Sequence, residues 1–489
     1  MRKKMLDYLD TTDLSKIKLL YFLENSKTSA IAFDKVQEEI SFTKYQTTRL
    51  IEGIKADLQM FNYPNCFHFD LKTKKQHIIY KRLTHENIYM LIARYAKRSR
   101  LGKMVEFIVS EKGEKILDLE EYLYISHSGM YRLLELFKEL SSDYRIEVSK
   151  KIRFSGNEWE IREFLYQFYY VLYKSFAYPF SETIEQRCQT IIFLLVESGL
   201  FERKLSDAEY IKVTYRLFVL LVRNHMGYFA QQPPFKLEEK NYFSEKIYKI
   251  FECYFDGDEE ELKKEVAQFL FFLETEDILP IRTKTEEVIV VELNRLFIQY
   301  IEKHGKNLLP FTKQKRFLQE LVRIHRRCFL LKRPNFYMAK YQNFDFIREN
   351  YSFAEIISNG FVQSLLEEKK FLALTKKMYK ELVCEYLFLL MNQMPESELS
   401  FKVSVYVDFS YGKNYNEYII KNLTSFQQMN LNILTKENVE RKIVDIYLSD
   451  IPTVKKYPFQ ILWTSPPSPY DWESFGELVV KARREKSGK

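Results

Sequence analysis

The sequence predicts a mostly helical, multidomain protein that ends in a small α/β domain. Glycine and proline are scarce, at 13 residues each among 489, and so few helix breakers favour helices joined by short loops. The pattern LVRNH at Leu221–His225 returns after 100 residues as LVRIH at Leu321–His325. Such a repeat indicates duplicated helical regions. After residue 400, strand-like segments alternate with a helix-like one, which predicts a parallel sheet.

Composition narrows the possible functions. Residues 1–100 contain 19 Lys+Arg and 11 Asp+Glu, which accounts for the whole net charge of +8. A localised basic region is typical of a nucleic-acid-binding end. The five cysteines are scattered without a CxxC pair, which argues against a zinc site or a disulfide frame. The helical middle of the chain has no Gly-rich phosphate loop, so no cofactor is expected. No apolar run is long enough for a membrane span, and the first residues lack the apolar core of a signal peptide, so we expect a cytoplasmic protein with no membrane partner.

Residues 1–88 predict a first winged helix-turn-helix unit. Apolar residues recur at helical spacing three times between residues 14 and 58, with a tight turn at Ser41–Thr43. Two alternating strands then flank the basic turn at residues 72–75, which predicts a hairpin wing. The outward residues of the third helix and the lysines of the wing suit contacts with base edges and phosphates. The predicted DNA contacts are Lys44, Tyr45, Gln46, Thr48, Arg49, Lys72, Lys74 and Lys75. Winged units also serve as protein-interaction modules, so this pattern alone is weakly specific.

Residues 89–160 repeat the pattern. Helices are predicted over 101–109, around 119–123, and from Ser126 onward, where a serine can cap the third helix. Strands at 144–148 and 151–154 would form the second wing. The outward residues of this unit predicted to contact DNA are Ser126, His127, Ser128, Tyr131 and Arg132.

The junction after the second unit is the most specific motif. Gly156 ends a strand, Asn157 can cap a helix with acidic residues in its first turn, and the sequence continues as Ile161-Arg162-Glu163-Phe164-Leu165. This junction, together with the order of elements along the whole chain, resembles the Mga-type virulence and sugar-responsive regulators of Gram-positive bacteria. The resemblance implies a transcription regulator that binds double-stranded promoter DNA as a homodimer. It implies two winged helix-turn-helix units, two phosphotransferase-system regulation domains (PRDs) and a C-terminal domain like the IIB component of sugar phosphotransferases.

Two helical bundles fill the middle of the chain. Residues 161–282 and 283–395 are rich in Phe and Tyr, and each closes with an apolar helix followed by a proline. Taken alone they are bundles of duplicated origin, and the resemblance identifies them as PRD1 and PRD2. His225 and His325 stand at the repeated positions, and the resemblance implies that they accept phosphoryl groups from the phosphocarrier protein of the sugar phosphotransferase system. The alternative is a pair of structural histidines that duplication placed at matching positions.

Residues 396–489 predict the α/β domain, and the chain has no cysteine after Cys384. A IIB domain would carry a phospho-accepting cysteine after its first strand, and without a thiolate this domain cannot transfer phosphate on sulfur. We therefore expect an interaction or dimerisation role for it. The sequence shows no catalytic motif, so no enzyme is expected. Two alternatives remain: an RNA-binding antiterminator, which begins with a β-rich domain, and a non-catalytic phosphotransferase-system component.

Overall fold

The computed structural model describes residues 5–26, 28–72, 76–84, 88–174, 179–231, 242–281, 287–333, 351–425, 430–436, 438–439, 443–453 and 455–486. The chain divides into two compact units. The first comprises Met1–Val291 and Arg323–Arg333, and the second comprises Glu292–Val322 and Pro334–Lys489. None of the helices in this described part combines the length and apolar composition of a membrane span.

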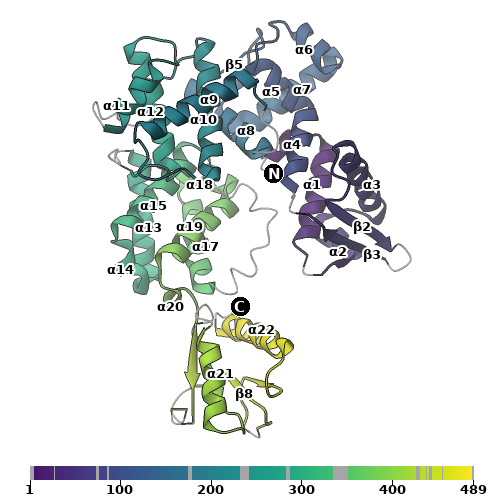
Figure 1. Ribbon diagram of the computed structural model, residues 1–489, viewed down its shortest axis with the longest axis vertical. Helices are drawn as coiled ribbons and strands as arrows, with labels where there is room; N and C mark the ends of the chain where they lie inside the picture. Colours follow the sequence, from purple (N-terminus) through teal and green to yellow (C-terminus); the bar gives the residue numbers. More distant parts are fainter. Residues whose placement is uncertain are drawn as a thin grey trace. The chain divides into compact units, whose positions relative to one another are not determined.

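The first winged unit has the predicted elements. Helices α1 (Thr11–Glu24), α2 (Phe33–Ile40) and α3 (Lys44–Met60) follow the short 3-10 turn η1 (Met5–Tyr8), and strands β2 (Phe67–Lys72) and β3 (His77–Arg82) form the hairpin (Figure 1). The predicted inner face of α3 is buried, including Ile51 and Ile54. A third strand, β1 (Ala30–Ala32), pairs antiparallel with β3. This strand was not predicted, because three residues are too few to show alternation.

The second winged unit contains α4 (Ile88–Arg98), α5 (Arg100–Val109), α6 (Ile116–Leu123) and α7 (His127–Ser141). Its wing is smaller than predicted. Tyr144 lies in a 3-10 turn, η3 (Ser142–Tyr144), and Arg145 has φ 52°, so only β4 (Glu147–Val148) and β5 (Phe154–Ser155) pair. The alternation of apolar residues from Tyr144 onward therefore reflects burial in a turn and not an extended strand.

The first helical bundle consists of α8 (Glu158–Tyr173), α9 (Glu182–Glu197), α10 (Asp207–His225), α11 (Tyr242–Phe251) and α12 (Glu259–Thr275). Asn157 caps α8, because its side chain accepts a hydrogen bond from the backbone N–H of Trp159 at 2.9 Å. Aromatic rings fill the interior; for example, Tyr169 and Phe180 both pack against Phe218. The aromatic stripes of this region are thus core residues.

The following helices are α13 (Val288–His304), α14 (Leu309–Thr312), α15 (Lys315–His325), α17 (Ser352–Glu367), α18 (Lys369–Lys377), α19 (Tyr379–Gln393) and α20 (Glu396–Leu399), with the 3-10 turn η4 at Lys306–Leu308. A π-helical segment, Arg326–Leu330, continues α15. Most of α15 belongs to the second compact unit, whereas Arg323–Arg333 belongs to the first. The five-domain division made from the sequence remains a prediction, because these two units are larger than any of the five.

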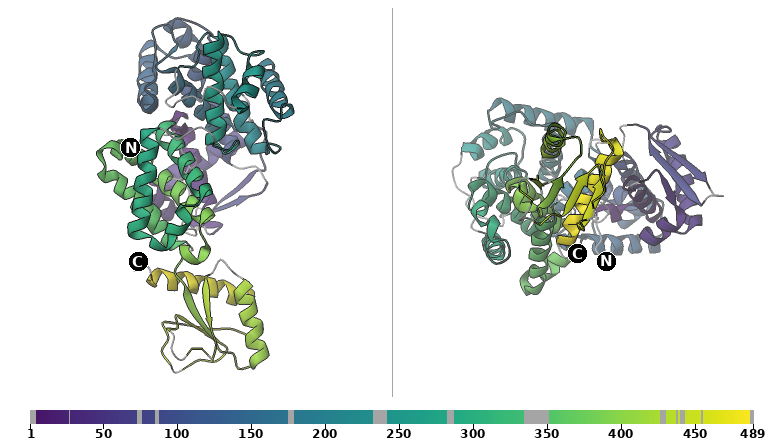
Figure 2. Two further views of the ribbon diagram at one scale, coloured as in Figure 1. Left: turned by 90° about the vertical axis from the view of Figure 1, so that its left-hand side faces the viewer. Right: turned by 90° about the horizontal axis from the view of Figure 1, so that it is seen from below.

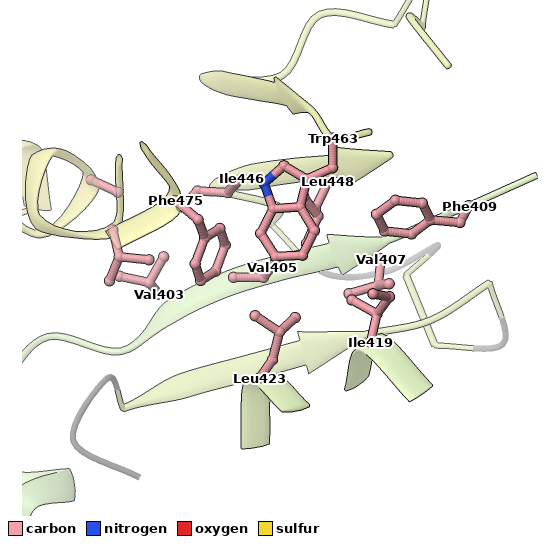
Figure 3. Close-up of a cluster of buried hydrophobic side chains, with 12 residues drawn as sticks. Val403, Val405, Val407, Phe409, Ile419, Leu423, Ile446, Leu448, Trp463 and Phe475 are labelled. Atoms are coloured by element: carbon pink, nitrogen blue, oxygen red, sulfur yellow. The ribbon is translucent and has the colours of Figure 1, made fainter. Parts of the chain in front are cut away.

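The C-terminal domain is the predicted α/β structure. Strands β6 (Val403–Val407), β7 (Leu431–Leu434), β8 (Ile446–Ser449) and β9 (Phe459–Leu462) form a parallel sheet in the order β7-β6-β8-β9. Helices α21 (Lys413–Ser425) and α22 (Pro469–Lys486) accompany it (Figure 2). Alternate β6 residues such as Val405 pack with Leu423 of α21 and Phe475 of α22 in one core (Figure 3). Both helices therefore cover the same face of the sheet.

Candidate nucleic-acid interface

Helix α3 presents part of the predicted DNA-contacting set to solvent. The Tyr45 side chain is 74% exposed and Arg49 is also exposed. Gln46 instead forms a capping box with Thr43, and Lys44 Nζ donates to Gln76 Oε1 at 3.0 Å. The Thr48 hydroxyl donates to the carbonyl of Lys44 within the helix. The outward face available for base edges therefore rests mainly on Tyr45 and Arg49.

The first wing carries Lys72 at the end of β2, opposite His77 at the start of β3. Lys74 and Lys75 were also predicted to contact phosphates, and they lie outside the described residues. The hairpin pairing on both sides of them matches the predicted wing.

Helix α7 of the second unit begins as predicted. The Ser126 hydroxyl accepts from the backbone N–H of Gly129 at 3.3 Å and lies 3.3 Å from the hydroxyl of Ser128. His127 Nδ1 lies 2.5 Å from a carboxylate oxygen of Glu120 on α6, and its ring meets Tyr131 edge-on, with the ring centroids 4.9 Å apart.

Glu120 therefore orients the ring of His127, while Tyr131 and Arg132 on the same helix are exposed. The outward face at the start of a third helix is where helix-turn-helix proteins reach base edges.

Two lysines of the second wing, Lys150 and Lys151, are not among the DNA contacts predicted from the sequence. Lys150 and Lys151 are exposed in the turn between β4 and β5, where the N–H of Ser149 donates to the carbonyl of Arg153 at 2.8 Å. A pair of adjacent lysines in a predicted turn was a usable signal, since it resembles the lysines of the first wing. Such a turn suits phosphate contact.

A partly buried ionic cluster joins the first unit to α4. Lys16 Nζ donates to Asp57 at 2.6 Å, Arg98 donates to Asp57 at 2.8 Å and to Asp13 at 2.6 Å, and the Tyr95 hydroxyl donates to Asp57 at 2.8 Å. Burial alone would raise the pKa of Asp57, but Arg98 and Lys16 outweigh it and lower that pKa. The cluster thus links α1, α3 and α4 through charge-assisted hydrogen bonds.

A second, fully buried network begins at the junction motif. Arg162 of α8 donates to Glu265 of α12 at 2.5 Å and to Glu158 at 3.0 Å, and Arg223 of α10 pairs with Glu158 at 2.7 Å. The Asn224 side chain donates to the backbone of residue 256 and its oxygen accepts in return, at 2.9 and 2.7 Å. The Ile161–Leu165 motif therefore places an arginine where it binds α12 directly, and Glu158 links the same arginine to Arg223 of α10.

His225 lies at the end of α10 with its side chain 34% exposed. Its Nδ1 lies 2.7 Å from Asp256 Oδ2, and Arg187 Nη1 lies 2.9 Å from its Nε2. Arginine can only donate, so Nε2 accepts and Nδ1–H donates to Asp256. This arrangement orients the imidazole with Nε2 toward a guanidinium and Nδ1 toward a carboxylate.

His325 occupies a different environment although the sequence pattern repeats. It is completely buried, and burial lowers its pKa to about 3. Arg216 and Arg316, which are separated by the same 100 residues as the two histidines, also differ. Arg216 is buried and paired with Glu163, whereas Arg316 is exposed. The repeated sequence pattern thus ends a helix at both His225 and His325, but the surroundings of its polar residues differ.

The predicted IIB-like domain would carry a phospho-accepting cysteine in the loop after β6. There the N–H of Ser410 donates to Asp450 Oδ1 at 2.8 Å, and the Ser410 hydroxyl also bonds to that carboxylate. The carboxylate of Asp450 therefore accepts hydrogen bonds from both the amide and the hydroxyl of Ser410. Across the described residues, no group of three His, Cys, Asp or Glu side chains is arranged to hold a metal ion.

Comparison with known proteins identifies the second unit. Residues 84–169 match the Mga helix-turn-helix domain, a range that spans α4 to α7, the second wing and most of α8. This part of the chain is similar to the DNA-binding domain of Mga-type regulators. A protein of Streptococcus pneumoniae serotype 4 named "Putative trans-acting regulator" is 26% identical over 147 residues, which covers 30% of this chain and 29% of that protein. The resemblance inferred from the junction motif is thereby confirmed for the Mga-type domain.

Proposed function

We propose that this protein is a DNA-binding transcription regulator. The observation that carries the proposal is the second winged unit, which matches the Mga helix-turn-helix domain and presents Tyr131 and Arg132 on α7. The first unit offers Tyr45 and Arg49 at the corresponding place. Both units carry basic wings, and the excess positive charge of the chain lies in its first 100 residues. These features suit promoter DNA, with arginines for bases and lysines for phosphates.

Fluorescence anisotropy with labelled promoter fragments from the organism's genome tests this proposal. We expect binding whose affinity falls steeply with salt, because phosphate contacts release counterions. Arg132→Ala should weaken binding by about 1–3 kcal/mol if the arginine reads a base. Arg203→Ala, on an exposed arginine of the first bundle, is the matched control and should bind like the wild type. Salt-independent binding, or no binding, would contradict the proposal.

We further propose that His225 receives a phosphoryl group from the phosphocarrier protein of the sugar phosphotransferase system. Asp256 orients the imidazole. Once Arg187 releases Nε2, the lone pair of Nε2 would attack the phosphorus of the phosphorylated carrier, whose own bond to that phosphorus breaks, and Arg187 would then compensate the added negative charge. His325 was predicted as a second acceptor, and its burial means that the helix would have to open first. In this proposal the two bundles are PRDs and report sugar uptake to the DNA-binding units.

Transfer of labelled phosphate from the phosphocarrier protein tests this second step. Wild type and His325→Ala should incorporate label, and His225→Ala should not. Absence of label in the wild type would contradict phosphorylation, and label retained in His225→Ala would assign it to another residue. The C-terminal domain, which lacks the cysteine of a IIB component, is proposed to hold a homodimer in the cytoplasm, so that paired units gain avidity on DNA.

A further inference from the structure

A residue of the first bundle reaches the second winged unit. The Tyr228 hydroxyl donates to Glu111 Oε1 at 3.3 Å, and Arg153 Nε lies 2.7 Å from the same oxygen. Arg153 also donates to the carbonyl of Gly113 at 2.8 Å. Glu111 and Gly113 follow α5, and Arg153 belongs to the wing, so one carboxylate joins three separate segments of the chain.

The bundle holds Tyr228 from two sides. Arg162 Nη2 donates to the Tyr228 carbonyl at 2.7 Å, and the Arg223 guanidinium lies 3.8 Å above the tyrosine ring. Burial, with a contribution from Glu111, raises the pKa of Tyr228, so the hydroxyl keeps its proton and donates it to Glu111. Both arginines belong to the buried network of α8 and α10. Tyr228 is therefore a partly buried side chain that is anchored to that network.

Arg153 in turn closes the turn that carries the wing lysines. Its carbonyl accepts from the N–H of Ser149 at 2.8 Å, and its own N–H donates to the Ser149 hydroxyl at 3.2 Å. Lys150 and Lys151 lie between these two hydrogen-bonded residues. Displacing the Arg153 guanidinium would therefore loosen the segment that presents both lysines.

We propose that Tyr228 is a positioning residue for DNA binding: through Glu111 and Arg153 it fixes the second wing so that Lys150 and Lys151 meet phosphates. The inference rests on the proposed function and deepens it. Tyr228 lies three residues after His225, the last residue of α10, so a shift of this segment would reach the second wing through Glu111 and Arg153. Tyr228→Phe removes only the hydroxyl, and Tyr242→Phe, on an exposed tyrosine of the same bundle, is the matched control.

The first experiment measures the binding of the full chain to a random-sequence duplex of about 40 base pairs over a range of salt concentrations. Lys150→Ala/Lys151→Ala should reduce the slope of log affinity against log salt by about 1.8, since each phosphate contact contributes about 0.9. Tyr228→Phe should lower affinity about three- to tenfold and should have no further effect in the double-lysine variant. Equal affinity of Tyr228→Phe and wild type, or a full additive loss in the double-lysine variant, would overturn the positioning role.

The second experiment needs no DNA and separates this inference from the proposed function. Hydrogen exchange of the full chain should show faster exchange at the amides of Ser149 and Ile152 in Tyr228→Phe, with unchanged exchange in α5 and α7. Unchanged exchange at both wing amides would overturn the inference even if the protein binds DNA. If wild type does not bind the duplex at all, the DNA-binding role fails, and faster wing exchange would support only the mechanical link.

Discussion

His325 shows how burial changes the chemistry of a repeated residue. Its sequence context matches that of His225, yet its ring is enclosed and its pKa is lowered to about 3. The unfolded chain binds a proton near the usual histidine pKa of about 6.5, whereas the folded chain does not. Between these values the unfolded state holds more protons, so stability must fall as pH falls.

The first prediction concerns this residue. In urea titrations between pH 7 and pH 4, His325→Gln should lose less stability than wild type. The difference should approach about 1.4 kcal/mol per pH unit below pH 6, because one proton per molecule distinguishes the two unfolded states. His68→Gln, on an exposed histidine of the first wing, should follow the wild type. Parallel pH profiles of wild type and His325→Gln would contradict the burial of an unprotonated ring.

Arg162 is the central residue of the buried network. Removing its charge leaves Glu265 buried without its arginine partner, since both side chains are fully enclosed. Breaking such a pair by deleting one partner typically costs about 3–5 kcal/mol.

We therefore predict that Arg162→Met lowers the free energy of unfolding by about that amount in urea titrations. Arg203→Met, which removes an exposed ion pair with Glu209, should leave the unfolding midpoint unchanged. A midpoint of Arg162→Met equal to that of wild type would mean that the network contributes no net stability.

At the scale of elements, the junction between the second wing and α8 determines where the first bundle begins. Gly156 has φ 148°, a conformation that side chains rarely adopt, and an added Cβ would lie 2.9 Å from the carbonyl oxygen of Arg145. Asn157 then caps the helix, and Glu158 and Glu160 occupy its first turn. A constrained glycine and a capping side chain thus explain the start of α8.

Asn157→Ala should destabilise the chain by about 1 kcal/mol, because the first turn of α8 loses the acceptor for the N–H of Trp159. Asn157→Asp keeps that acceptor and should be nearly neutral. Urea titrations of both variants measure the difference. Equal stability of Asn157→Ala and Asn157→Asp would show that the cap contributes nothing to stability.

The elements differ in how well the sequence predicts them. Amphipathic helices such as α3 and α5, and the C-terminal sheet, follow from apolar spacing alone. The three residues of β1 do not, because their pairing with β3 is a tertiary contact. The Lys150–Lys151 turn follows from the sequence as well, because two adjacent lysines stand at a predicted turn. The hydrogen bond from Tyr228 to Glu111 joins residues 117 positions apart. Patterns of neighbouring residues do not predict a contact between such distant positions.

At the scale of the whole molecule, the sequence predicted matching roles for the two histidines, and the structure separates them. His225 is accessible and held between Asp256 and Arg187, whereas His325 is enclosed. The sequence repeat shows where similar helices end, but burial depends on what packs around each histidine. The segment Arg323–Arg333 belongs to the first compact unit, although most of α15 belongs to the second, and that difference could not be read from a repeat.

The central claim is that the paired winged units bind promoter DNA and control transcription. Genome-wide mapping of bound DNA in living cells tests it most directly, with the wild-type chain compared with an Arg49→Ala/Arg132→Ala variant. We predict discrete peaks upstream of genes for wild type, loss of those peaks in the variant, and altered transcription of the neighbouring genes. A wild-type profile without enrichment over background, in cells that contain the folded protein, would contradict the claim.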